Sequence, residues 1–83
     1  MYHTYILYSQ QLDKYYIGAC GTDLNRRLQE HLWKHSGFTS KAKDWEIKYV
    51  EDYETKELAY QRERQIKKWK SRKMIEALIR KGN

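Results

Sequence analysis

The chain has 83 residues, of which 40% are hydrophobic and 34% charged, with a formal net charge of +6 and one cysteine. This length permits one domain with a thin core, and a single cysteine excludes a disulfide framework. No apolar run approaches the roughly 18 residues of a transmembrane helix. Because Met1 leads directly into a strand pattern, we expect a cytoplasmic protein without a signal peptide or membrane contact.

The first predicted elements form a β-hairpin. Residues 3–8 and 14–19 have the alternation and the β-forming side chains of strands, and the residues between them are polar and typical of a turn. Gly18 and Gly21 are expected to allow a tight connection after the second strand.

A helix is predicted next, capped by Thr22 or Asp23 and ending near Trp33. Leucines recur at every fourth position along it and give it a buried face. These are Leu24, Leu28 and Leu32. The polar residues 34–44 that follow are expected to form a loop.

A third strand is predicted over residues 45–53, because its side chains alternate again. One face would carry Trp45, Ile47, Tyr49 and Glu51, and the other Lys48, Val50 and Asp52.

Two further helices complete the predicted fold. Thr55 is expected to cap a helix that runs to about Trp69, and Ser71 a last helix that ends near Gly82. Their apolar residues are Leu58, Ala59, Ile66 and Trp69 in the first, and Met74, Ile75, Leu78 and Ile79 in the second. The order β-β-α-β-α-α predicts an α+β fold, a small α/β layer in which helices flank a three-stranded, mainly antiparallel sheet.

The positive charge is concentrated in the last third of the chain. Residues 1–54 contain seven basic and eight acidic side chains, whereas residues 55–83 contain ten basic and three acidic ones. A one-sided basic surface is typical of a protein that binds a phosphate backbone. The alternative is a solvated helix surface whose charge only keeps the protein soluble.

Two charged residues of the first helix are candidates for chemistry. Arg27 and His31 are four residues apart on one flank of the leucine stripe. The planar fork of arginine grips phosphate oxygens, and histidine can move a proton near neutral pH. The alternative is that both are ordinary residues of a helix surface.

The second helix offers an acid in a basic setting. Glu63 lies at the margin of the apolar stripe among arginines and lysines, where a carboxylate can hold a divalent cation that bridges to phosphate. A helix salt bridge with Lys67 is the alternative. Cys20 has no His or Asn placed to activate it and is expected to be structural.

Tyrosines form the third candidate group. Tyr5 and Tyr16 are close neighbours in the predicted hairpin. Since nearby cations stabilise a phenolate, either of them could accept a proton. The other strand tyrosines are expected to pack in the core or at its rim; they are Tyr2, Tyr8, Tyr15, Tyr49 and Tyr53.

Together these residues resemble the GIY-YIG nuclease superfamily across essentially the whole chain, as a short single-domain member of bacterial type over residues 1–83. His3-Thr4-Tyr5 stands where the family has Gly-Ile-Tyr, and Tyr16-Ile17-Gly18 is the Tyr-Ile-Gly element intact. Residues 23–31 are similar to the family's D-L-x-x-R-L-x-x-H helix, and residues 59–67 to its A-x-x-R-E-x-x-I-K segment.

The resemblance implies an endonuclease that hydrolyses DNA phosphodiester bonds with a single divalent ion, Mg²⁺ or Mn²⁺. Its substrates would be branched, damaged or single-stranded DNA, as in DNA repair. Glu63 would bind the metal, Arg27 would hold the scissile phosphate, and His31 would relay a proton. Either Tyr5 or Tyr16 would take that proton from the attacking water. Gly18 would let the backbone turn tightly beside the site.

Other cations are expected to contact DNA; they are Arg26, Lys41, Arg62, Lys67 and Lys70. Larger relatives carry an Asn well after the metal-binding Glu, where this chain has residues 71–75, Ser-Arg-Lys-Met-Ile. The alternative function is therefore a nucleic-acid-binding module of the same fold that cuts weakly or not at all. A third is an interaction domain with solvated basic helices. The sequence gives neither a preferred DNA structure nor an oligomeric state.

Overall fold

The computed structural model describes residues 1–21, 26, 29 and 42–82. Three strands form one antiparallel sheet in the order β2-β1-β3, with bounds of Tyr2–Ser9 for β1, Lys14–Cys20 for β2 and Glu46–Tyr53 for β3. Two helices follow in the chain, α2 over Lys56–Trp69 and α3 over Arg72–Gly82. The predicted α+β fold is confirmed, and all three strands lie where the alternation placed them.

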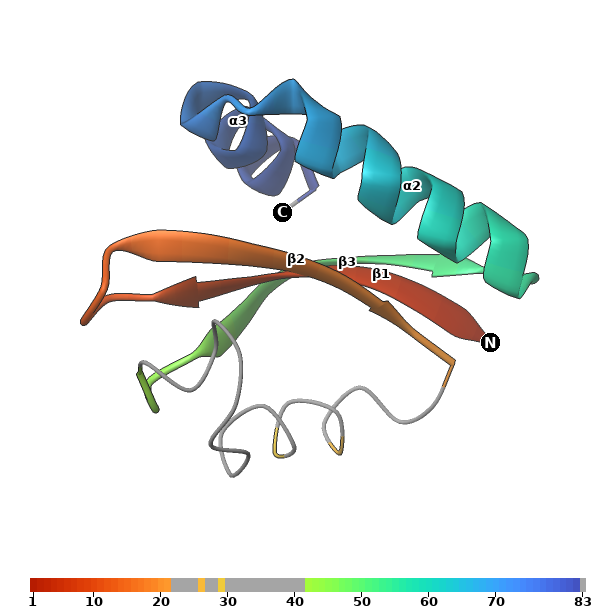
Figure 1. Cartoon of the computed structure of the whole chain (residues 1–83), viewed down its shortest axis with the longest axis horizontal. Coiled ribbons are helices and arrows are strands. Elements are labelled where there is room, and N and C mark those ends of the chain that lie inside the picture. Colours follow the sequence, from red (N-terminus) through yellow and green to blue (C-terminus); the bar gives the residue numbers. More distant parts are fainter. Residues whose placement is uncertain (22–25, 27–28, 30–41, 83) are drawn as a thin grey trace.

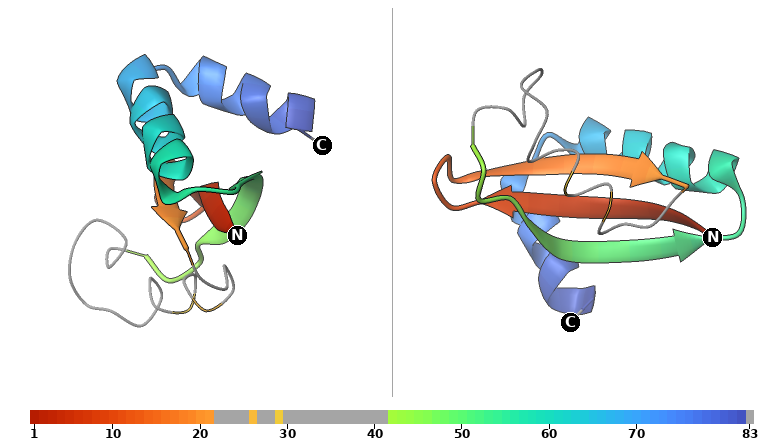
Figure 2. Two further views of the ribbon diagram at one scale, coloured as in Figure 1. Left: turned by 90° about the vertical axis from the view of Figure 1, so that its right-hand side faces the viewer. Right: turned by 90° about the horizontal axis from the view of Figure 1, so that it is seen from below.

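Both helices cover the same face of the sheet (Figures 1 and 2). The predicted first helix falls almost wholly on residues outside the described part of the chain. Arg26 and Gln29 are its described positions, and both are helical and exposed. No helix within the described ranges is long and apolar enough to cross a membrane.

The helix ends follow the predicted caps. The Thr55 hydroxyl accepts from the amide of Leu58 at 3.3 Å, which satisfies a free N–H of the first turn of α2. Lys70 ends α2 in the left-handed conformation with a φ of 50°. The hydroxyl of Ser71 then accepts from the amide of Met74 at 3.3 Å at the start of α3.

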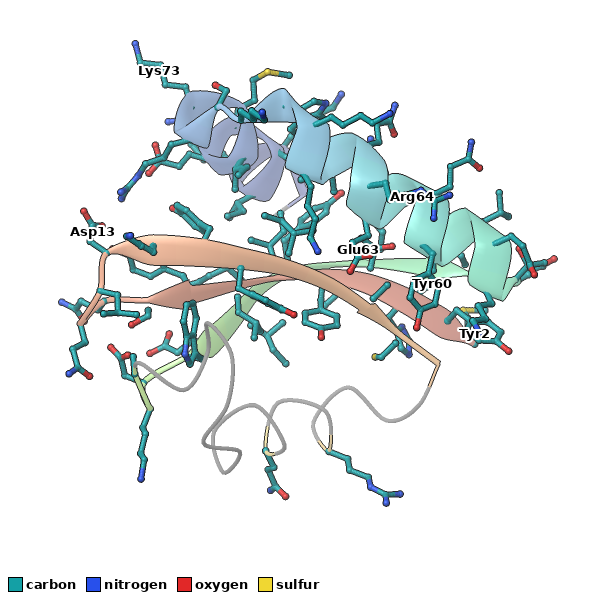
Figure 3. The ribbon with its side chains drawn as sticks, in the orientation of Figure 1. Tyr2, Asp13, Tyr60, Glu63, Arg64 and Lys73 are labelled. Carbon is teal, nitrogen blue, oxygen red and sulfur yellow. The ribbon has the colours of Figure 1, made fainter. Side chains whose placement is uncertain are left out.

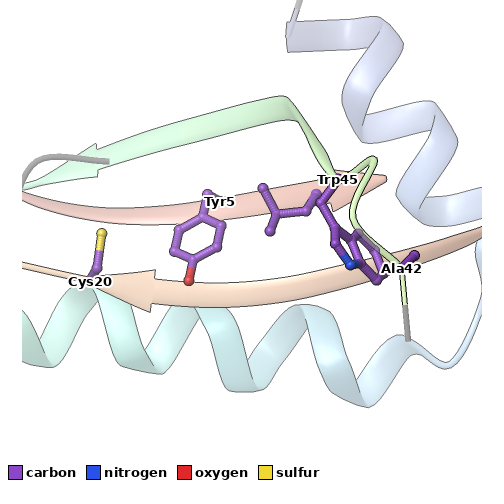
Figure 4. Close-up of a cluster of buried hydrophobic side chains, with 5 residues drawn as sticks. Tyr5, Cys20, Ala42 and Trp45 are labelled. Atoms are coloured by element: carbon purple, nitrogen blue, oxygen red, sulfur yellow. The ribbon is translucent and has the colours of Figure 1, made fainter. Parts of the chain in front are cut away.

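Two hydrophobic clusters lie on opposite faces of the sheet. Ile6, Ile17 and Ile66 form one beneath α2 and α3. On the other face, a row of buried side chains runs along the sheet (Figure 4). It consists of Tyr5, Leu7, Cys20, Ala42 and Trp45. Cys20 is therefore a buried core residue, consistent with a structural role.

A bulge in β3 overturns the predicted faces of that strand. Ile6 pairs with Tyr49 and Leu7 with Ile47, so Lys48 is an extra residue in the ladder. Ile47 packs in the Tyr5 cluster, whereas Tyr49 packs beneath the helices with Ile66. The prediction of one face for Ile47 and Tyr49 was wrong, because strict alternation does not survive an inserted residue.

Two of the apolar residues of the predicted helices are not buried. Leu58 and Met74 both have exposed side chains. Each lies in the first turn of its helix, at the end of the layer. The buried contacts of α3 come instead from Ile75, Leu78 and Ile79.

Candidate active site at the outer edge of β2

Tyr5 lies at the centre of the sheet and packs directly over a glycine. It is 1% exposed and pairs with Gly18 across the β1–β2 ladder. A Cβ atom at position 18 would lie 2.5 Å from the Tyr5 hydroxyl oxygen and 2.6 Å from Cζ of the same ring. Gly18 therefore provides room for a tyrosine inside a strand, and the predicted role of a tight turn is corrected.

Tyr16 lies on the same face as Tyr5, in the diagonal position of the ladder, because its partner is Leu7. Its ring is partly exposed and meets Trp45 edge-on, with 6.4 Å between the ring centroids. Tyr5 and Tyr16 thus pack in one cluster, as the hairpin predicted.

Lys67 connects the two faces of the sheet at this edge. It belongs to α2, which covers the face opposite to Tyr16, yet its Nζ atom lies 5.9 Å from the centroid of the Tyr16 ring. β2 is an outer strand, so a side chain from α2 can reach this ring past its free edge. Long lysine stems allow this reach while the ammonium stays in water.

Glu63 completes the arrangement. Its side chain is 16% exposed and lies on the side of α2 that faces the sheet (Figure 3). One carboxylate oxygen, Oε2, is 3.6 Å from Nζ of Lys67, one helical turn further along. The salt bridge offered by the sequence as an alternative role is therefore present. Tyr16, Lys67 and Glu63 form a continuous chain of contacts around the edge of β2.

Whether a divalent cation could bind here depends on the donors available. No group of three or more His, Cys, Asp or Glu side chains gathers anywhere in residues 1–21, 26, 29 and 42–82. Mg²⁺ nevertheless binds commonly through one or two carboxylates, with waters and substrate phosphates filling the other positions. Glu63 fits this second kind of site, because it is a single, mostly covered carboxylate whose one ion-pair contact with the described residues is long.

Arg62, the neighbour of Glu63, is occupied on the other side of α2. Its Nε and Nη2 atoms donate to the two carboxylate oxygens of Glu51 at 2.9 and 3.2 Å, and Nη1 donates to Gln65 at 2.8 Å. The guanidinium also lies 5.4 Å from the centroid of the Trp69 ring. Sequence reasoning assigned Arg62 to DNA; in the structure it ties β3 to α2.

Glu51 also accepts hydrogen bonds from the Tyr49 hydroxyl at 2.5 Å and from the Tyr53 hydroxyl. Burial alone would raise the pKa of the Glu51 carboxyl, but Arg62 and these two hydroxyls hold it below its ordinary value. Burial, and next the bond to Glu51, raise the pKa of Tyr49 and of Tyr53 to about 12. This cluster is a structural network, consistent with the predicted packing role of its tyrosines.

Several predicted site residues lie outside the described residues; they are Arg27, His31 and Lys41. The structure places Arg26 on an exposed surface and Lys70 at the exposed junction of α2 and α3. Sequence reasoning offered the contact of Lys67 with Glu63 as an alternative, but it did not find the contact of Lys67 with Tyr16. The four-residue spacing of Glu63 and Lys67 was a signal for the first contact, but nothing in the sequence indicated the second.

No curated protein and no solved structure gives a significant match to the chain. The family model described as the GIY-YIG catalytic domain matches residues 1–76. This match covers Tyr5, the intact Tyr16-Ile17-Gly18 element and Glu63 of α2. The chain therefore belongs to the GIY-YIG catalytic domain family, and a nuclease acting on DNA is the function that this membership supports.

Proposed function

We propose that the protein is a metal-dependent endonuclease that hydrolyses phosphodiester bonds of DNA at the outer edge of β2. The observation that carries this proposal is the convergence of Tyr16, Lys67 and Glu63 from two faces of the sheet. Each supplies a group that phosphodiester hydrolysis uses: a proton acceptor, a cation and a metal-binding carboxylate. The whole chain would act as a single domain in the cytoplasm, on substrates such as branched or damaged DNA in repair.

Glu63 would hold one divalent ion, with Mg²⁺ as our first choice and Mn²⁺ as a substitute. A bound ion supplies Lewis-acid stabilisation of the charge that builds up on the phosphate oxygens. Lys67 would keep the carboxylate and the Tyr16 ring in place at the strand edge. From the family pattern, we assign Arg27 to the scissile phosphate and His31 to proton relay.

The burial of the two tyrosines favours Tyr16 as the group that takes the proton from water. Tyr5 is 1% exposed, with its hydroxyl against Gly18, whereas Tyr16 is partly exposed beside Lys67. A general base must reach the water that it activates. Tyr5 would then shape the site from within the core, and water would attack phosphorus in one step as a backbone phosphorus–oxygen bond breaks.

The test is a nicking assay on plasmid and branched DNA, with Mg²⁺ or with EDTA. We expect metal-dependent nicking by the wild type and its loss in Glu63→Gln and Arg27→Ala. Glu57→Gln is the matched control, because Glu57 is an exposed acid of the same helix. Nicking that survives Glu63→Gln would come from a contaminant and would overturn the proposal. Salt-sensitive binding without nicking would favour the binding module instead.

A further inference from the structure

A hollow next to the proposed site lies where the hairpin end, the last turn of α2 and the first turn of α3 meet. Its volume is ≈ 420 Å³, within the range of about 300–1,000 Å³ that small-molecule pockets span. Three isoleucines and four cations are among the residues that line it; they are Ile17, Ile66, Ile75, Lys14, Lys67, Lys70 and Arg72. The hollow therefore combines apolar surface with positive charge.

The apolar part suits the flat face of a nucleobase. Ile17 and Ile66 are buried members of the core cluster beneath the helices, and Ile75 is half-buried above them. The Tyr15 ring also lines the hollow, but it already contacts the Tyr8 ring at 4.8 Å and the Arg72 guanidinium at 5.4 Å between centres. A base would therefore pack chiefly on Ile75, whose side chain is not buried, unlike those of Ile17 and Ile66.

The cations of the hollow differ in how firmly they are held. Arg72 is fixed by Asp13 at 2.6 Å and by Glu76 at 3.2 Å, and it also donates to the backbone carbonyl of Asp13. Lys70 is exposed and has no side-chain partner among the described residues. Its ammonium is thus the cation that an incoming phosphate can take without breaking an existing pair.

The hollow adjoins the proposed site through Lys67. This residue lines the hollow and is the ion-pair partner of Glu63. Ile17, which also lines the hollow, follows Tyr16 in β2 and packs on the opposite face of the sheet. A DNA strand whose scissile phosphate lies against Glu63 would therefore bring a neighbouring nucleotide to the hollow.

We propose that this hollow is a subsite for one unpaired nucleotide next to the scissile phosphate, with its base on Ile75 and its phosphate on Lys70. The inference rests on the proposed function and deepens it by naming a substrate class. A base inside a duplex is stacked and paired, so it cannot enter the hollow without being extruded. The substrate is then DNA with an unpaired nucleotide at the cleavage point, such as a flap or a single-stranded end.

The test measures binding rather than cleavage, with the full chain in EDTA. Two oligonucleotides of equal length carry 2-aminopurine, a fluorescent adenine analogue, either within a duplex or as an unpaired nucleotide at a flap junction. We expect tighter binding of the flap and a fluorescence change confined to it. Equal affinities for the two DNAs, with no fluorescence change for the flap, would overturn the inference.

Two variants and one control tie the effect to the hollow. Lys70→Asn keeps a residue that tolerates the left-handed conformation and removes the free cation. We expect the slope of log affinity against log salt for the flap to fall by about 0.7. Ile75→Ser should weaken flap binding roughly fourfold, the value of about one buried methylene group. Circular dichroism checks that the Ile75→Ser variant folds. If this variant does not fold, the salt dependence of Lys70→Asn alone tests the subsite.

Lys68→Gln is the matched control, because it removes the same charge on the other side of α2. There Lys68 and Arg64 line a separate hollow of ≈ 490 Å³ with Tyr53. An equal loss of flap preference in Lys68→Gln and Lys70→Asn would contradict the subsite. Flap preference in a wild type that cuts no DNA with Mg²⁺ would leave the subsite standing and overturn the proposed cleavage instead.

Discussion

Each side of α2 carries an ion pair between a glutamate and a basic residue, but the two pairs differ in how completely the carboxylate is bound. Towards β3, Arg62 and Glu51 form two hydrogen bonds, and their side chains are 22% and 17% exposed. Towards β2, Glu63 and Lys67 share one contact of 3.6 Å. The Glu51 carboxylate has donors on both oxygens, whereas that of Glu63 has room for another ligand. A saturated ion pair stabilises the fold, and an unsaturated one beside it is available for chemistry.

Glu63→Gln should produce the largest effect of any single change on the β2 side. The neutral amide holds a divalent ion far more weakly than the carboxylate does. Since the charge stabilisation by the ion is worth several kcal/mol, nicking should fall by about a hundredfold or more. Stability in urea should change little, because the ion pair that is lost is long and its lysine is half exposed. If Glu63→Gln lowered stability as strongly as it lowers activity, Glu63 would be a structural residue like Glu51, and the proposed difference between the two sides of α2 would be wrong.

Glu51→Gln should do the reverse on the β3 side. It leaves the Arg62 guanidinium without its charged partner, and we expect a loss of about 2 kcal/mol in the free energy of unfolding. Nicking per folded molecule should persist. Glu46→Gln is the control in the same strand: its pair with Lys48 is well exposed, so the loss should stay below about 0.5 kcal/mol. Equal losses in the two variants would mean that the Glu51 network contributes no special stability.

Gly18→Ala tests the core behind the site. The new methyl group would meet the Tyr5 ring, and overpacking of this kind costs about 1–3 kcal/mol. Tyr5→Leu removes the obstacle, so the double variant should lose less stability than the sum of the two single changes. Strict additivity in urea denaturation would show that the ring and the glycine are not in contact.

Alkaline pH should weaken the β3 side. The folded-state pKa of Tyr49 and Tyr53 is about 12, above the ordinary value of 10. Their contribution is therefore complete below pH 10 and is lost as the pH rises from 10 towards 12. Unfolding of the wild type should become easier over this interval, and less so in a Tyr49→Phe, Tyr53→Phe double variant. Identical pH profiles for the two proteins would contradict this.

The fold was largely predictable because its signals are local. Thr55 and Ser71 capped the helices as predicted, since a cap is recognisable within four residues. The bulge at Lys48 was not predictable, because it depends on how β3 pairs with a strand more than forty residues away. Glu63 stood out as an acid among bases, whereas the contact of Lys67 with Tyr16 required the position of α2 over an outer strand.

The role of Gly18 in the structure was not predictable either, for a related reason. Glycines near a strand end are typical of turns, and Gly21 immediately follows β2. Only the pairing of Gly18 with Tyr5 shows that the missing side chain is replaced by a neighbour's ring. Contacts between chain-distant residues thus account for most of what the sequence left open.

Thr4 stands where the family motif has isoleucine, and its buried hydroxyl donates to the backbone carbonyl of Ala59 at 2.7 Å. In an α-helix the same carbonyl accepts the amide of the residue four positions on, which here is Glu63. This hydrogen bond therefore sets how far α2 can slide along the central strand. A shift of one residue, about 1.5 Å along the helix axis, would displace Lys67 from the Tyr16 ring that it contacts. The threonine that replaces the isoleucine of the family motif thus fixes the position of α2 along the sheet.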